Sequence, residues 1–268
     1  MQPLDAFPED ARRRIKAVLA DIDDTLTTAG KLTADAYAAL ERLQGAGFLV
    51  LPITGRPAGW CDHIARMWPV DAVVGENGAF YFRYDQATKT FTKRYHDPDE
   101  VRAENRRRLE AVGEEILDSV PGTAMASDQP YRESDLAIDY CEDVARLSDD
   151  DVGRIVEIFE NAGATAKISS VHVNGWFGDY DKLAMTRRAL AECFGIDIDA
   201  DRRQIAFIGD SPNDAPMFEH FPHAVGVANV RDFESRLTAT PAYVTASAGG
   251  AGFAEAAEAL CRTRNAAD

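Results

Sequence analysis

The stretch VLADIDDTLT, residues 18–27, joins an apolar run to a cluster of carboxylates. Val18–Ala20 has the composition of a buried strand, and Asp21, Asp23 and Asp24 follow at once. Charges gathered where a buried strand ends repel one another and lose hydration, so something must compensate them. Two interpretations stay open at this point. One is a solvated turn, since Asp and Thr are ordinary turn and cap residues, and the other is a metal site with a carboxylate nucleophile.

Around this stretch, short apolar runs alternate with segments of helical spacing. The pattern predicts strands at 15–20, 48–53 and 72–74, with helices at 33–44 and 58–67 between them. The same rhythm returns from residue 182, with helices at 183–194, 215–219 and 252–261 and strands at 205–208, 224–227 and 243–244. This order implies a parallel sheet with right-handed crossovers.

The middle of the chain has a different character. It predicts a hairpin at 80–84 and 90–95, helices at 98–119 and 149–162, and strands at 136–140 and 166–173. We therefore expect an α/β protein in which a Rossmann-like parallel sheet core, residues 1–83 and 178–268, carries an inserted α+β domain at 84–177.

Composition excludes several classes of protein. The chain has 268 residues, 46% of them hydrophobic, and a formal charge of −16. That charge argues against a nucleic-acid binder, which needs clustered Lys and Arg, whereas a small phosphorylated ligand needs only local cations. Its four scattered cysteines suggest neither a disulfide framework nor a zinc site. Without a signal peptide or a membrane-length apolar run, we expect a cytoplasmic protein that does not bind membranes.

A second acidic cluster, IAFIGDSPNDAPMF at 205–218, mirrors the first. A buried run again ends in polar residues, here Asp210, Asn213 and Asp214. Ligands of open parallel sheets bind beyond the carboxyl ends of the strands, so the two clusters can meet there. Oxygen ligands without local His or Cys indicate Mg²⁺. The alternative is two unrelated polar loops.

Two further segments could bind an anion such as phosphate. The strand end LPITGRP, 51–57, supplies Thr54, Gly55 and Arg56, although it could also be a plain turn before a helix. Lys182 at a predicted helix start could add a positive charge, although a lone lysine is more often solvated.

Together the four segments resemble the haloacid dehalogenase superfamily of aspartyl-nucleophile phosphotransferases. The Asp-x-Asp-x-Thr motif stands at 21–25, the Thr-Gly strand end at 54–55, the lysine at 182 and the last acidic motif at 209–214. The insertion between the second and third motifs resembles the cap of the type IIB subfamily, which includes sugar-phosphate and sucrose-phosphate phosphatases. Glu76-Asn77-Gly78-Ala79 and the approach to Lys182 resemble that subfamily too.

The resemblance implies a role for each matching residue. Asp21 would be the nucleophile that forms an aspartyl-phosphate, and Asp23 the general acid and then the general base. The remaining roles concern the cation and the phosphate. Mg²⁺ would be held by Asp21, the Asp23 carbonyl, Asp210 and Asp214, while Thr54, Gly55 and Lys182 would bind the phosphoryl oxygens and Asn213 would orient Lys182 or the phosphate.

One position departs from the subfamily's pattern. The residue after the second aspartate is often Gly there, and here it is Asp24. We expect its carboxylate to point to solvent; otherwise it adds charge near the metal. Asp24 is therefore not among the expected catalytic residues.

The cap is expected to recognise the leaving group. His172, Asn174 and Trp176 alternate along HVNGWFG, so they could share one face of a strand. His172 and Asn174 are candidate substrate contacts, whereas packing at the cap–core junction explains Trp176 equally well. Arg56 and Asn77 could also line the cleft, and Tyr131, Arg132 and Glu133 are weaker candidates.

The sequence therefore predicts a Mg²⁺-dependent phosphomonoesterase for a small phosphorylated metabolite, with sugar phosphates as the first choice. A phosphomutase is the alternative within the superfamily, and a dehalogenase fits the aspartates less well. A non-catalytic sugar-phosphate sensor is the alternative from another class. Neither the individual substrate nor the oligomeric state follows from the sequence.

Overall fold

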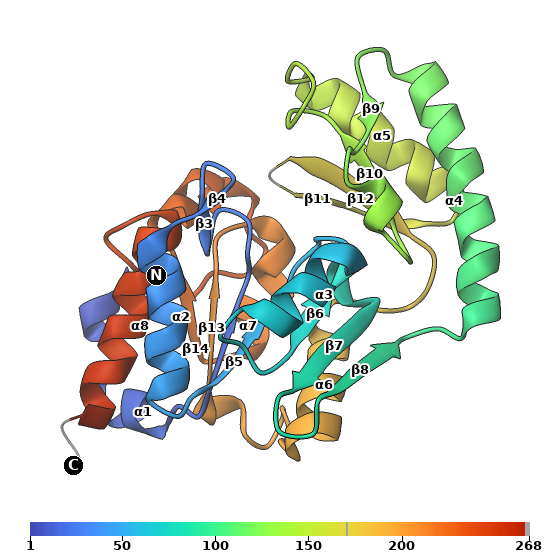
Figure 1. Ribbon diagram of the computed structural model, residues 1–268. Helices are drawn as coiled ribbons and strands as arrows, with labels where there is room; N and C mark the ends of the chain where they lie inside the picture. The colour runs from blue at the N-terminus through green and yellow to red at the C-terminus, as the bar shows by residue number, and fades with distance from the viewer. Residues whose placement is uncertain (170, 266–268) are drawn as a thin grey trace.

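The computed structural model of the protein describes residues 1–169 and 171–265. Its central sheet has six strands, and every neighbouring pair is parallel (Figure 1). In spatial order these strands are β1 (Gln2–Pro3), β15 (Tyr243–Val244), β14 (His223–Gly226), β13 (Ile205–Gly209), β2 (Ala17–Ala20) and β5 (Leu49–Pro52). The expected parallel α/β core is confirmed.

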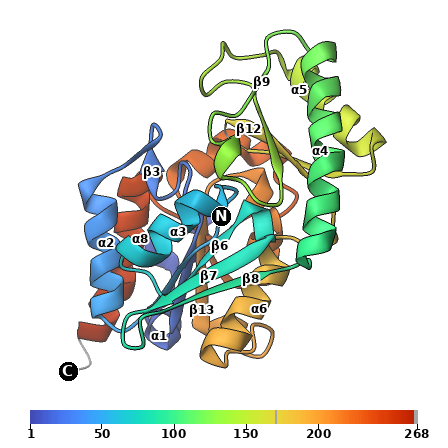
Figure 2. The same cartoon turned by 45° about the vertical axis from the view of Figure 1, so that its right-hand side comes forward.

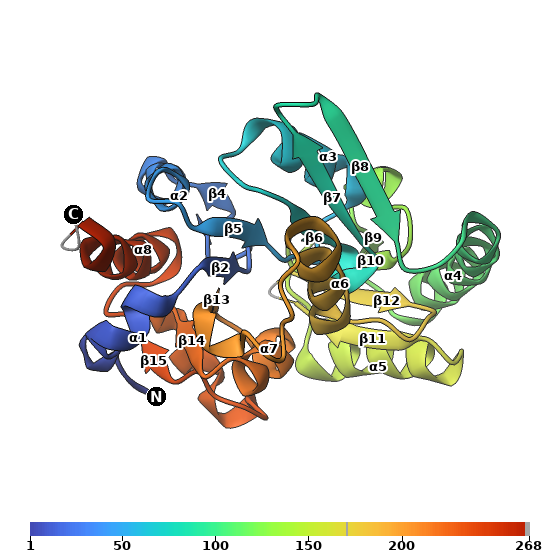
Figure 3. The same cartoon turned by 90° about the horizontal axis from the view of Figure 1, so that it is seen from below.

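Helices cover both faces of this sheet. They are α1 (Glu9–Arg14), α2 (Ala34–Gly45), α6 (Lys182–Phe194), α7 (Ala215–His220) and α8 (Gly249–Asn265), whereas α3 (Ala58–Met67) packs against the neighbouring antiparallel sheet. Figure 3 shows α2 and α8 on one side and α6 and α7 on the other. Val18 of β2 packs into the apolar cluster of Leu40 and Phe253, whereas Leu19 packs into the cluster of Met185. A strand buried on both faces needs an unbroken apolar run, which residues 17–20 supply.

A smaller antiparallel sheet stands beside the core. It consists of β6 (Val73–Gly75), β7 (Phe80–Asp85) and β8 (Thr90–Tyr95). A parallel bridge between Ile53 and Val74 links it to the end of β5. The strand expected at 72–74 therefore forms, but it pairs with the hairpin instead of widening the six-stranded sheet. Because the expected boundary at 83 and 84 cuts β7, we propose that the insertion begins after β8, which leads into α4 (Figure 2).

The insertion has a hydrophobic core of its own. Its four-stranded sheet has the spatial order β11 (Thr165–Ile168), β12 (His172–Trp176), β10 (Leu136–Asp139) and β9 (Ala124–Met125), with α4 (Asp99–Ser119) and α5 (Asp149–Asn161) beside it. Ile116, Ile138 and Phe159 are fully buried between these elements. No helix in the described part of the chain is long and apolar enough to cross a membrane.

Glu76 ties the insertion to the core. It follows β6 and is fully buried, with a positive φ of 43°. Its Oε1 accepts hydrogen bonds from the backbone N–H of Ala58 in α3 (2.9 Å) and of Glu133 (2.9 Å). Its Oε2 accepts from Ser134 (2.6 Å) and Asp135 (3.1 Å). One side chain thus joins the start of α3 to three successive peptides of the insertion.

Glu76→Gln is expected to destabilise the protein. Whichever way the amide turns, its NH₂ faces two of the backbone donors that now reach the carboxylate, and each stranded buried donor costs about 1–3 kcal/mol. Urea unfolding measures the change. Glu114→Gln, an exposed change in α4, is the control and should leave the free energy of unfolding unaltered. Equal stability of the Glu76 and Glu114 variants would refute this role of Glu76.

Candidate active site

The candidate site forms where three strands of the parallel sheet end. Asp21 follows β2, Asp210 follows β13, and Thr54 lies two residues beyond β5. The N–H of Asp21 donates to the carbonyl of Ile208 (2.9 Å), so the first acidic residue continues the strand pairing. The meeting of the two acidic clusters at one sheet edge is what the strand order predicts.

Three buried aspartates form the centre of the site. Ligand oxygens of Asp21, Asp210 and Asp214 all lie within 4.8 Å of one another. Burial raises the pKa of Asp21 to about 8, and Lys182 opposes that rise. Burial also raises the pKa of Asp210 well above its usual value, and the carboxylates of Asp21 and Asp214 raise it further. Such crowding favours a bound cation.

Lys182 lies at the first position of α6 and bridges two of these carboxylates. Its Nζ donates to Oδ1 of Asp21 (2.7 Å) and to Oδ1 of Asp214 (2.9 Å). Burial lowers the pKa of Lys182, but Asp21 and Asp214 outweigh it and hold that pKa above its ordinary value. Asp181 fixes the helix start by accepting a hydrogen bond from the N–H of Ala184 (2.7 Å).

The donor set fits Mg²⁺. Three carboxylates face a single lysine in this cluster, which leaves a formal charge near −2 that a divalent cation would neutralise. Oxygen-only ligands are those that Mg²⁺ prefers. Asp210 is held in place by Thr25 Oγ (3.1 Å) and by Asn229 Nδ2 (3.2 Å), both donors.

Asp23 points to a different partner. Arg56 Nε lies 3.0 Å from both Asp23 oxygens, and Arg56 Nη2 lies 2.9 Å from Oδ1. The same guanidinium reaches Asp128 (3.4 Å) and Glu142 (3.2 Å) in the insertion. Nε2 of His172 lies 2.8 Å from Glu142. The neighbouring His172 ring and the charge of Arg56 lower the pKa of Glu142 to about 2.

The expected phosphate-binding residues lie at the same edge. Thr54 is fully buried, and its Oγ accepts a hydrogen bond from the N–H of Arg56 (3.0 Å). A Cβ on Gly55 would lie 3.1 Å from Oδ1 of Asn77, so glycine permits this close approach. Asn213 accepts from Ser211 Oγ (2.7 Å). Among the described residues, the Lys182 ammonium donates to Asp21 and Asp214, not to Asn213.

The active-site cleft lies between core and insertion. From the core it is lined by Asp21, Asp23, Gly55, Arg56, Ser211 and Asn213, and from the insertion by Arg132, Ser169, Val171, His172 and Asn174. Its volume is about 20 Å³, so the contacts between core and insertion leave little free space here. Asn77, though beside Gly55, is not among the lining residues. Trp176 stacks on Tyr180 instead (ring centroids 5.7 Å apart), as the packing alternative expected.

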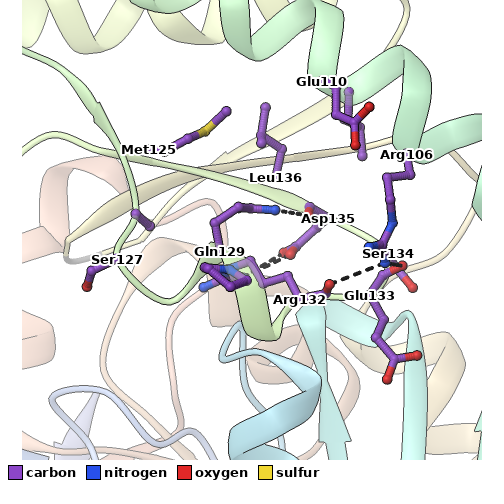
Figure 4. A pocket seen from close by; sticks show the side chains of 13 residues that line it. Arg106, Glu110, Met125, Ser127, Gln129, Arg132, Glu133, Ser134, Asp135 and Leu136 are labelled. Atoms are coloured by element: carbon purple, nitrogen blue, oxygen red, sulfur yellow. Dashed lines mark hydrogen bonds and ion pairs between the residues drawn. The ribbon is translucent and has the colours of Figure 1, made fainter.

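Arg132 also lines a second cavity, which lies in the insertion. That cavity measures about 500 Å³ and lies between α4 and the segment 125–136 (Figure 4). Arg132 is bound by Asp128 (3.0 Å) and Asp135 (2.9 Å), and it donates to the carbonyl of Gly55 (2.9 Å). Arg132, a weak candidate from the sequence, thus connects the insertion with the strand end at Gly55.

Several residues of the site carry no motif. Asp128, Glu142 and Asn229 contact Arg56 or Asp210, as described above, but Asp128 and Glu142 lie in loops of unremarkable composition and Asn229 lies in the 3-10 helix Ala228–Arg236. Of these three residues, Asn229 alone could have been identified from the sequence. It follows the carboxyl end of β14, and ligand-facing residues of parallel sheets gather at such strand ends.

Asp24 has the backbone conformation that favours glycine, with φ 55°. This explains why glycine suits the position, and aspartate is among the residues that tolerate it. Its charge is near enough to Asp210 to raise the pKa of that carboxyl. Its side chain is half-buried, not fully turned to solvent.

Asp24→Gly is expected to keep the activity, because the substitution suits the backbone and removes no expected catalytic group. In Asp24→Ala, residue 24 still has to adopt a positive φ, so the free energy of unfolding should fall by about 1 kcal/mol. Phosphate release and urea unfolding, measured on both variants, check these outcomes. A tenfold loss of kcat in Asp24→Gly would give Asp24 a catalytic role that we do not assign.

Comparisons with known proteins identify the family and the fold. A family model described as haloacid dehalogenase-like hydrolase matches residues 15–221. A search of curated proteins finds no match. A Thermoplasma acidophilum protein of known structure has a TM-score of 0.68 at 18% identity, covering 92% of this chain and 98% of that one.

Two solved phosphatases share the fold. The sucrose-phosphatase of Synechocystis sp. PCC6803, solved with sucrose and phosphate, has a TM-score of 0.61 at 17% identity, covering 92% of this chain and 98% of that one. A sugar phosphatase of haloacid dehalogenase subclass IIB has a TM-score of 0.59 at 12% identity, covering 94% and 98%. At such identities the likeness establishes the fold.

Proposed function

The chain belongs to the haloacid dehalogenase-like hydrolases, and from this premise we propose that it is a Mg²⁺-dependent phosphomonoesterase that acts on a small phosphorylated metabolite. The expected superfamily resemblance is thereby confirmed, whereas the reaction, the metal and the substrate are our proposal. Sugar phosphates are the substrate class that we favour, since two structures of the same fold are a sucrose-phosphatase and a sugar phosphatase.

One observation carries the proposal. The Asp21 carboxylate lies in a buried cluster with Lys182, Asp210 and Asp214. A second carboxylate, that of Asp23, lines the same cleft as Asp21 and accepts hydrogen bonds from Arg56. Phosphoryl transfer through a phosphoenzyme intermediate needs a nucleophile beside cationic groups. It also needs a separate general acid and base.

The residues then divide the reaction into two steps. An oxygen of Asp21 attacks phosphorus, and the bond to the leaving alcohol breaks as Asp23 gives its proton to the alcohol oxygen. In the second step Asp23 takes a proton from water, which attacks the aspartyl-phosphate and releases inorganic phosphate and Asp21. Lys182, Thr54 and the Gly55 N–H neutralise the transferring oxygens.

Arg56 holds the Asp23 carboxylate at the cleft, where Asp23 serves as the proton donor of the first step and the base of the second. Mg²⁺, held by Asp21, the Asp23 carbonyl, Asp210 and Asp214, would supply positive charge for the phosphoryl group.

Phosphate release from a broad panel of phosphorylated metabolites tests the proposal. Protein stripped with EDTA should be inactive, and added Mg²⁺ should restore turnover of at least one monoester without any bisphosphate activator. Isomerisation of a sugar phosphate that requires such an activator would indicate a mutase. Saturable binding without turnover would indicate a sensor. Either result would overturn the phosphomonoesterase assignment.

A further inference from the structure

A cavity of about 420 Å³ adjoins the active-site cleft at Asp23 and Arg56. We call it the tryptophan cavity; its other walls include Trp60, Trp68, Ile22, Leu32, Ile64 and His63. Helix α3 forms one side through Trp60, His63 and Ile64, whose spacing puts them on one helix face. The small hairpin of β3 (Thr27–Thr28) and β4 (Lys31–Leu32), which sequence periodicity did not predict, forms the other side.

The two spaces are unequal in a way that bears on the substrate. With about 20 Å³, the active-site cleft has room for about one water molecule. The tryptophan cavity falls within the range of about 300–1,000 Å³ that is usual for ligand pockets. Asp23 and Arg56 line both spaces. Of these two spaces, both lined by described residues, the tryptophan cavity is therefore the one with room for a group that begins at Asp23.

The walls of the cavity indicate what fits. Trp60 keeps 43% of its surface exposed, although a Trp ring is a large apolar surface. The Arg56 guanidinium lies over one face of that ring, 4.5 Å from its centre, and holds the ring in place. Trp68 and the aliphatic side chains make the remaining wall apolar, while Asp23, Arg56 and His63 add polar atoms. Flat apolar walls with a few polar groups suit a ring.

We propose that the tryptophan cavity receives the leaving alcohol, and that the substrates are phosphomonoesters whose alcohol carries a ring with an apolar face. The inference rests on the proposed function, since Asp23 must reach the oxygen of the leaving alcohol and the cavity begins at Asp23. A pyranose ring and an aryl ring share this chemistry.

Three substrates test the proposal and separate the two sources of a ring. Glucose 6-phosphate carries a pyranose, phenyl phosphate carries an aryl ring, and acetyl phosphate carries neither. Trp68→Ala and Trp60→Ala should each lower kcat/KM for at least one ring substrate about tenfold more than for acetyl phosphate. The ring with the larger relative loss identifies the source. Met67→Ala, a 64% exposed neighbour on α3 outside the cavity, should change no kcat/KM value.

Equal losses for all three substrates would overturn the proposal, because Trp60 would then act only through Arg56 or through stability. Unchanged kcat/KM values in both variants would overturn it as well, and would indicate that the insertion alone binds the leaving group.

A binding measurement keeps this test separate from the proposed function. In Asp21→Asn, glucose 6-phosphate or phenyl phosphate should give a saturable change in tryptophan fluorescence that Trp60→Ala removes. If the wild type releases no phosphate but this response is present, the phosphomonoesterase proposal fails and the ring site stands. If neither ligand gives a response, the ring site fails even where turnover is found.

Discussion

Asp21→Asn is expected to lower kcat for phosphate release by at least about 10⁴-fold while the protein stays folded. The amide cannot serve as the nucleophile, and no other carboxylate of the cluster replaces it, because Asp210 and Asp214 are held by Thr25, Asn229, Lys182 and backbone N–H groups. Because burial and neighbouring carboxylates raise the pKa of Asp21, its removal also relieves repulsion in the metal-free protein.

Phosphate release and thermal unfolding measure the two effects. Asp24→Asn is the matched control, since it removes a carboxylate from the same motif and should keep at least about a tenth of the wild-type kcat. Residual activity of Asp21→Asn equal to that of Asp24→Asn would show that Asp21 does not carry the chemistry.

Lys182→Met is expected to destabilise the metal-free protein by about 3–5 kcal/mol, because it strands the buried carboxylates that Lys182 now bridges. Methionine has nearly the same length and lacks the charge. Without the lysine the cluster is more negative, so Mg²⁺ should bind more tightly and restore part of the lost stability. Urea unfolding with EDTA and with Mg²⁺ measures both effects.

Lys167→Met is the control, because Lys167 is exposed on β11. It should change neither the free energy of unfolding nor the response to Mg²⁺. If Mg²⁺ stabilises Lys182→Met no more than it stabilises the wild type, the cluster is not the cation site. Activity of Lys182→Met close to that of the wild type would remove Lys182 from the phosphate-binding groups.

The sequence predicts the core of this fold well because its signals are local. Buried strands such as β2 and β13 read as apolar runs, and α2 begins where Thr33 accepts a hydrogen bond from the N–H of Ala36 (3.3 Å). β1, β3, β4 and β9 are not predicted, because two residues cannot show a period. The equally short β15 is predicted from the apolar pair 243–244 alone. The pairing of β6 with β7 depends on tertiary packing, which no local pattern records.

The site also contains residues that local motifs predict and contacts that depend on tertiary packing. Asp21, Lys182, Asp210 and Asp214 follow from motifs at strand and helix ends, and the topology brings them together. The contacts of Arg56 with Asp128 and Glu142 cross from core to insertion, so they depend on how the two parts meet. The contribution of Glu76 is of this kind too, since its four donors come from segments far apart in the sequence.

The central claim is that the Asp21 carboxylate takes up the phosphoryl group, and acid-quenched peptide mass spectrometry tests it most directly. The protein is mixed with Mg²⁺ and a phosphomonoester that it hydrolyses, and the reaction is quenched in acid within one turnover. The protein is then digested and its peptides are analysed. We predict one added phosphoryl group on the peptide that contains Asp21, and none on that peptide in Asp21→Asn. Rapid phosphate release with the phosphoryl group on another residue, or on none, would contradict the claim.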